Sequence, residues 1–125
     1  MSYQSFEDLE VWKACREFRK SITLLCKKFP IEEKYKLVDQ ILRSSRSVTA
    51  NIAEGHGRYH YQENIQSCRQ ARGSLTETLD HLIVAQDDCY IDNNTMSEER
   101  ILYNKCLRLL NGYIAYLKSK KANEI

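Results

Sequence analysis

The sequence predicts an all-α protein, an antiparallel up-down-up-down four-helix bundle, in which residues 1–125 form one domain. Apolar residues recur at alternating spacings of three and four through four long segments, as they do on one face of a helix. Strand signals are absent, because no run alternates apolar and polar residues between turn residues. Only one connection between the segments is long. Short connections make neighbouring helices antiparallel, which favours the bundle.

The first helix is predicted over residues 6–29. Ser5 is a suitable N-cap with Asp8 three residues later, and Pro30 ends the helix. The apolar positions repeat as a heptad seam: Val11, Cys15, Phe18, Ile22, Leu25 and Phe29. These side chains are expected to face the core.

The second helix is predicted over residues 32–56, with Glu32 and Glu33 in its positive first turn. It stops at Gly55, His56 and Gly57, where we expect a glycine in the left-handed conformation. The middle of this helix carries small side chains: Ser44, Ser45, Ser47, Ala50 and Ala53. Small residues let two helices approach closely, so this helix should pack tightly against the segment around residues 71–77.

The third and fourth helices are predicted over residues 60–87 and 96–120. Residues 87–94 form the long loop, after which Thr95 and Glu98 make a capping box. The last helix has two parallel apolar stripes, and one bundle core requires only one. The surplus predicts an oligomer interface that includes Tyr103, Tyr113 and Tyr116.

Two polar residues fall in otherwise apolar seams, Asn51 in the second helix and Arg72 in the third. A buried guanidinium needs a carboxylate, and Glu54 and Glu77 are the available candidates. We therefore predict a structural polar core of Asn51, Glu54, Arg72 and Glu77, in which one or both carboxylates pair with Arg72.

A second group of polar residues suggests a contact with nucleic acid. Arg43, Arg46 and Arg58 flank the small-residue face, and Arg69 lies one turn before Arg72. Such a basic stripe can contact phosphates, and Tyr59 and Tyr61 beside it can stack on unpaired bases. The alternative is that these arginines pair with nearby carboxylates, since Glu54 lies four residues before Arg58.

Composition excludes few functions. The formal net charge of +2 does not by itself imply nucleic acid or an anionic membrane, although residues 1–60 carry a surplus of +3 and residues 61–125 a deficit of −1. Five cysteines without a C-x-x-C pair favour buried thiols in a reducing compartment. No signal peptide is evident, and no apolar run approaches the roughly 20 residues that span a bilayer. We expect a cytoplasmic protein with no membrane partner.

No residue pattern predicts an enzyme, a metal site or a cofactor. His56 and His60 are four residues apart, but no further ligand completes a set. The Gly55-x-Gly57 pattern follows a helix instead of a strand, so it is no dinucleotide fingerprint. We expect no catalytic residue.

Three blocks of sequence resemble the small four-helix-bundle proteins encoded in intervening sequences of bacterial 23S rRNA genes. They are FEDLEVWKAC at residues 6–15, TANIAEGHGR at 49–58 and ARGSLTE at 71–77, and the resemblance covers roughly residues 5–118. The same fold resembles the accessory variability determinant proteins of diversity-generating retroelements. The resemblance implies a homopentameric barrel. The retroelement proteins bind nucleic acid and a reverse transcriptase through a strongly basic surface, whereas the net charge here is modest.

Two functions are therefore expected. The first is a non-enzymatic oligomeric bundle that binds RNA or DNA, as an accessory to a nucleic-acid enzyme such as a reverse transcriptase. The alternative is a protein–protein interaction scaffold with no nucleic-acid role, in which the tyrosine-rich last helix supplies the interface and the arginines are structural.

Overall fold

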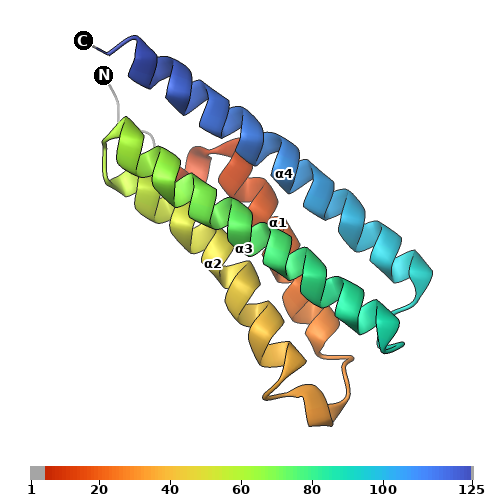
Figure 1. The fold of residues 1–125 in the computed structure, drawn as a ribbon. Helices are drawn as coiled ribbons and strands as arrows, with labels where there is room; N and C mark the ends of the chain where they lie inside the picture. The colour runs from red at the N-terminus through yellow and green to blue at the C-terminus, as the bar shows by residue number, and fades with distance from the viewer. Residues whose placement is uncertain (1–4, 125) are drawn as a thin grey trace.

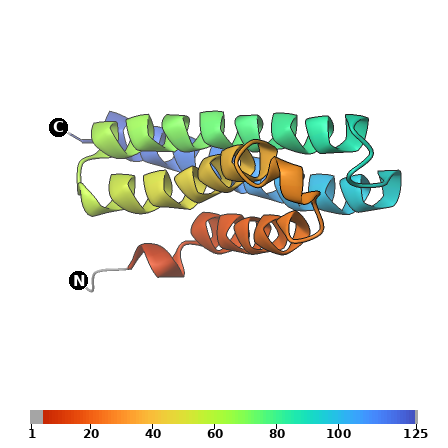
Figure 2. The same cartoon turned by 90° about the horizontal axis from the view of Figure 1, so that it is seen from below.

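The computed structural model describes residues 5–124, and these form the predicted four-helix bundle (Figure 1). The helices are α1 (Glu10–Cys26), α2 (Leu37–Gly57), α3 (Tyr61–Asp87) and α4 (Asn93–Ala122). Each helix packs against the next along the chain, and α4 returns to α1. The backbones of α1 and α3 do not approach each other closely, and these two helices lie on opposite sides of the bundle (Figure 2).

Both ends of α1 differ from the predicted 6–29, since the helix begins at Glu10 and ends at Cys26. Ser5 caps a separate 3-10 turn, Phe6–Asp8, by accepting a hydrogen bond from the Glu7 backbone N–H at 3.1 Å. Leu9 then adopts an extended conformation, which breaks the helix before α1 begins at Glu10. A second 3-10 turn, Ile31–Glu33, precedes α2, which starts later than predicted.

Two cap predictions are wrong. Asp92 is the N-cap of α4, because its Oδ1 accepts a hydrogen bond from the Thr95 N–H at 2.7 Å, so the helix begins three residues before the predicted residue 96. No glycine has a positive φ; in the α2–α3 turn that conformation belongs to Tyr59, with φ 61°.

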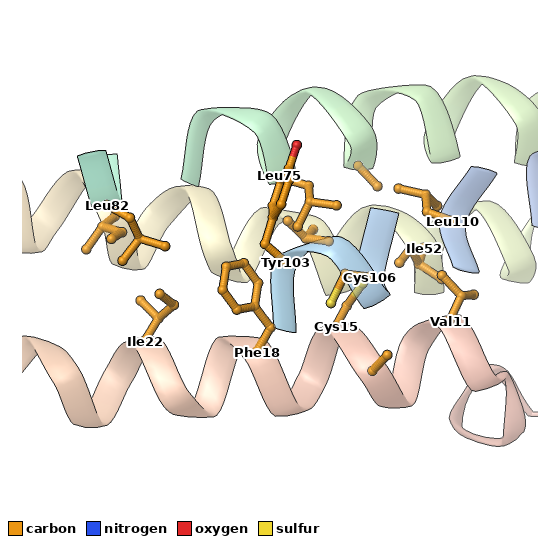
Figure 3. Packing of buried hydrophobic residues seen from close by; sticks show 14 of the residues in the cluster. Val11, Cys15, Phe18, Ile22, Ile52, Leu75, Leu82, Tyr103, Cys106 and Leu110 are labelled. Carbon is orange, nitrogen blue, oxygen red and sulfur yellow. The ribbon is translucent and has the colours of Figure 1, made fainter. Parts of the chain in front are cut away.

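The core is built from large apolar side chains of all four helices, such as Phe18 and Ile22 of α1 and Leu82 of α3. Figure 3 shows Phe18 pointing toward Tyr103 of α4; the two rings meet edge-on with centroids 6.4 Å apart. Because the rings and aliphatic groups interlock between the helices, this apolar contact stabilises the bundle.

Four of the five cysteines lie within this core: Cys15, Cys26, Cys68 and Cys106. Cys15, Cys68 and Cys106 are buried, and the sulfur atoms of Cys15 and Cys106 point toward each other (Figure 3). Burial raises the pKa of Cys68 to about 11, and contact with Cys106 together with burial raises the pKa of Cys15 further. Cys15 and Cys68 therefore stay protonated and behave as small apolar groups.

Helices α2 and α3 make the most extensive contact in the bundle, as the small-residue pattern predicts. Gly55 marks the tightest point: a Cβ there would lie 2.7 Å from Asn64 Oδ1 and 2.8 Å from Ser67 Cβ. This glycine is required for close approach and not for backbone freedom.

Candidate nucleic-acid interface

The predicted pairing of Arg72 is wrong. Arg72 is only half-buried, and its Nη1 donates a hydrogen bond to Asn111 Oδ1 of α4 at 2.9 Å. Glu54 pairs instead with Arg58 at 3.2 Å, and Glu77 contacts His81 at 3.1 Å. Position 72 lies at the edge of the α3 seam, where a long side chain reaches solvent and needs no buried carboxylate.

Asn51 also lies outside the predicted network. Its Nδ2 donates to Ser47 within α2, at 2.9 Å to the carbonyl oxygen and 3.0 Å to Oγ. Ser47 Oγ in turn accepts a hydrogen bond from Ser74 Oγ of α3 at 3.0 Å. A second hydroxyl contact, Ser44 to Thr78 at 2.8 Å, is fully buried. The polar contact between α2 and α3 therefore consists of neutral hydroxyl groups.

A buried amide completes this contact near the α2–α3 turn. Asn64 faces Gly55 across the helix pair, and its Nδ2 donates to the Tyr113 hydroxyl at 3.1 Å. Burial raises the pKa of Tyr113, and the hydrogen bond from Asn64 opposes that shift. Asn64 escaped the sequence analysis, although its position four residues before buried Cys68 is a signal of an inward side chain.

The four arginines of the predicted basic stripe fall into two groups in the structure, those with a carboxylate partner and those without one. Arg43 pairs with Asp39 at 2.9 Å, and Arg58 is shared between Glu54 and Glu63, so local carboxylates partly neutralise both arginines. This is the outcome that the alternative interpretation gives for Arg58. Arg46 and Arg69 have no carboxylate partner among residues 5–124, and they lie in two different grooves.

Arg69 lies in a groove between the start of α3 and the end of α4, which we call the α3–α4 groove. It has a volume of about 350 Å³ and is lined by Gln62, Ile65, Arg69, Lys118, Lys121 and Ala122. Lys121 Nζ donates to Gln62 Oε1 across the groove. Three cations and no carboxylate line it, so the groove suits an anion.

The two tyrosines predicted to stack on bases, Tyr59 and Tyr61, are close in sequence to the groove residue Gln62. Tyr59 precedes Gln62 by three residues and is 73% exposed, and Tyr61 is the half-buried first residue of α3. Lys118 and Lys121 also line the groove but were not predicted as site residues. Their i,i+3 spacing was visible, but their meeting with Arg69 depends on the antiparallel packing of α3 and α4.

Arg46 lies in a second groove, between α1 and α2, with a volume of about 590 Å³. We call it the α1–α2 groove, and it is lined by Arg19, Lys20, Thr23, Leu24 and Arg46. Arg19 is held by a hydrogen bond from its Nη1 to Thr49 Oγ1 at 2.8 Å. Leu24 is 62% exposed, so this groove combines positive charge with apolar surface.

The predicted interface tyrosines have three different environments. Tyr103 is 7% exposed and belongs to the core of its own bundle, so it is unavailable to a partner and that prediction is wrong. Tyr113 is half-buried and its ring stacks on Tyr116, with centroids 6.3 Å apart. Tyr116 is 53% exposed, and Lys120 Nζ lies 5.7 Å from its ring centroid.

One buried acid remains outside these sites. Glu99 is 6% exposed in the α1–α4 contact; its Oε2 accepts a hydrogen bond from Ser21 Oγ at 2.7 Å, while Oε1 has no partner among the described residues. Burial raises the pKa of Glu99, and the Ser21 hydroxyl opposes that shift. The Ser21 hydroxyl is the one hydrogen-bond partner of this carboxyl group among residues 5–124, and we relate the pair to stability.

Within residues 5–124, no three His, Cys, Asp or Glu side chains converge as ligands for a metal. No helix in that range is both long enough and apolar enough to cross a lipid bilayer.

The fold defines a small all-α, four-helix-bundle protein, and cationic side chains line the two grooves described above. The chain belongs to the 23S rRNA-intervening sequence protein family, whose sequence model matches residues 7–112. It is also similar to a solved protein of unknown function from the S23 ribosomal protein family of Bacteroides thetaiotaomicron VPI-5482. That structure gives a TM-score of 0.76 and 27% sequence identity, covering 83% of this chain and 97% of the other. No curated protein matches the sequence.

Proposed function

We propose that this protein is a non-enzymatic, self-associating bundle that binds RNA or DNA through the α3–α4 groove. The observation that supports this function is the composition of the groove, in which Arg69, Lys118 and Lys121 converge without a carboxylate. Phosphates neutralise such clustered cations and release counterions, which is the main source of affinity for nucleic acid.

The neighbouring turn favours unpaired bases over a regular duplex. Tyr59 is exposed, Tyr61 begins α3, and aromatic side chains beside a cationic groove stack on the bases of single strands. The partner we propose is therefore single-stranded nucleic acid or a loop in structured RNA.

Self-association would make this small site effective. One groove offers only three cations, so a single subunit would bind weakly. Several copies in one assembly would present the groove repeatedly, and avidity raises the overall affinity without any new contact. The homopentamer implied by the family resemblance is the assembly we propose.

The test measures binding of single-stranded DNA and of structured RNA at about 50 and 200 mM salt by fluorescence anisotropy. Three neutralised phosphates on a single strand give a slope of roughly −2 in log K against log salt, a loss of about twentyfold over this range per groove engaged. The triple variant Arg69→Gln, Lys118→Gln, Lys121→Gln should lose that part of the slope.

The matched control is Lys28→Gln, Lys34→Gln, Lys36→Gln, which removes the same charge from exposed positions around the α1–α2 connection. It should retain most of the affinity and the slope. Equal losses in the two triple variants would show that overall charge, and not the groove, governs binding. Absence of binding by the intact protein at the lower salt would leave the interaction scaffold as the function.

A further inference from the structure

Charge is separated between the outer surfaces of α1 and α3. Residues 13–28 contain six Lys or Arg and one Glu, whereas residues 73–87, the second half of α3, contain three Asp or Glu and no Lys or Arg. We define the cationic face as the exposed α1 residues Arg16, Lys20 and Leu24 together with Lys27, the C-cap residue of that helix. We define the acidic face as the exposed α3 residues Glu77, Asp80, Val84 and Asp87. Spacings of three and four place each set on one side of its helix.

The two faces point away from each other on one molecule. Helices α1 and α3 are diagonal in the bundle, so their outer surfaces lie on opposite sides (Figure 2). A single subunit therefore cannot bring its own cationic and acidic faces together.

Both faces lie at the same level along the bundle axis. Helices α1 and α3 run in the same direction and end at the same end of the molecule (Figure 1). There the two connections touch: the Tyr90 hydroxyl donates to Glu33 Oε2 at 2.6 Å, and the rings of Phe29 and Tyr90 lie 5.8 Å apart. Two copies placed side by side with parallel axes would thus bring opposite charges to matching heights.

Much of the charge on these faces is unpaired within the subunit. Among residues 5–124, Asp80, Asp87 and Lys27 have no ion-pair partner, and Lys20 has only an exposed contact with Glu17 at 3.7 Å. Exposed pairs of that kind contribute little and exchange readily for better partners.

Each face also has one apolar residue among its charges. Leu24 is 62% exposed on the cationic face, and Val84 is 37% exposed on the acidic face. Contact between two such faces would remove both apolar groups from water while opposite charges surround them.

We propose that the cationic face of one copy docks against the acidic face of the next copy. Three positive charges, at residues 16, 20 and 27, then meet three negative charges, at residues 77, 80 and 87. A second copy of the chain satisfies both faces at once, whereas a nucleic acid would cover only the cationic one. The contact is head-to-tail, the type that closes into rings or extends into filaments. This inference rests on the self-association in the proposed function and leaves the α3–α4 groove open.

The first measurement is the mass of nuclease-treated protein by light scattering and sedimentation, at 50 and 500 mM NaCl. Assemblies should form at the lower salt and dissociate toward the 14.7 kDa subunit at the higher salt, with the dissociation constant rising about tenfold or more. Removing nucleic acid first ensures that protein contacts alone are measured.

Charge reversal then tests the two faces. Arg16→Glu, Lys20→Glu, Lys27→Glu should yield monomers, and so should Glu77→Lys, Asp80→Lys, Asp87→Lys. The variant with all six substitutions restores the complementarity in reverse and should assemble again. The control Lys28→Glu, Lys34→Glu, Lys36→Glu makes the same charge change outside the faces and should assemble normally. Helical circular dichroism confirms that each variant is folded.

Three results would overturn the inference. If either single-face variant still assembles, or if the six-residue variant remains monomeric, the charged faces are not the contact, although self-association through another surface would stand. If the intact protein is monomeric at 50 mM NaCl, both this inference and the proposed self-association fail. Binding of nucleic acid to the α3–α4 groove is measured separately and would be unaffected.

Discussion

Gly55→Ala is expected to destabilise the protein, although alanine is the better helix former. Helix propensity alone would raise the free energy of unfolding by about 1 kcal/mol. The new methyl group would, however, lie 2.8 Å from Ser67 Cβ and 3.2 Å from Asn64 Cα, neither of which can move without shifting α3. Overpacking of this kind costs about 1–3 kcal/mol.

The displaced Asn64 side chain adds to that cost. The methyl group would lie 2.7 Å from Asn64 Oδ1, and moving this amide weakens its buried hydrogen bond to Tyr113, worth about 1 kcal/mol. The net loss is about 1–3 kcal/mol, which lowers the urea midpoint by about 1 M at a typical m-value.

The matched control is Gly73→Ala in α3. A Cβ at that position has no atom within 4 Å, so the change should raise the midpoint through helix propensity. The two glycine variants are thus expected to shift stability in opposite directions. If both raise the midpoint, the close approach of α2 and α3 at Gly55 is wrong.

Three further predictions concern stability and thiol reactivity. Because burial raises the pKa of Glu99, folding favours its protonated form, and the free energy of unfolding should fall as pH rises above the ordinary glutamate range. In urea titrations, Glu99→Gln should be about 1–3 kcal/mol more stable than the intact protein at pH 8 and similar to it at pH 4. Equal stability of the two proteins at both pH values would contradict this. Arg72→Met should lower the free energy of unfolding by at most about 1 kcal/mol in the same assay, since only an exposed hydrogen bond to Asn111 is lost. A loss above about 3 kcal/mol would instead indicate that Arg72 forms a buried ion pair with a carboxylate. Ellman's reagent should react rapidly with one thiol of the native protein, that of exposed Cys89, while the four buried thiols react only on unfolding. Cys89→Ser should abolish the rapid phase. A rapid phase that persists in this variant would show that a second thiol is accessible.

Periodicity in the sequence was sufficient to predict the helices and most of the core. Spacing alone predicts that Cys15, Phe18 and Ile22 point inward, because a helix turns by a fixed angle per residue, and all three are buried. Arg72 shows where this reasoning stops. Spacing gives the angle of a residue around its helix but not the reach of its side chain, and a long side chain at a seam edge can extend into solvent.

The exact start of a helix and the contacts between helices were harder to predict than the helices themselves. Asp92 and Thr95 are both acceptable N-caps, and only the observed hydrogen bond decides between them. The α3–α4 groove joins Arg69 to lysines far away in the chain, so its charge emerges only when the helices are aligned. The stripe of arginines in the sequence is local, and local carboxylates partly neutralise Arg43 and Arg58.

The hydroxyl contacts between α2 and α3 have a consequence for how the helices find their alignment. Ser44 meets Thr78 and Ser47 meets Ser74 at fixed heights, so sliding α2 by one turn would break both hydrogen bonds between the helices and leave Ser44 and Thr78 only their backbone acceptors within their own helices. Apolar contacts such as that between Phe18 and Tyr103 are less directional, so they discriminate less between neighbouring alignments. The α2–α3 pair therefore sets the register of the bundle, and α1 and α4 adjust to it.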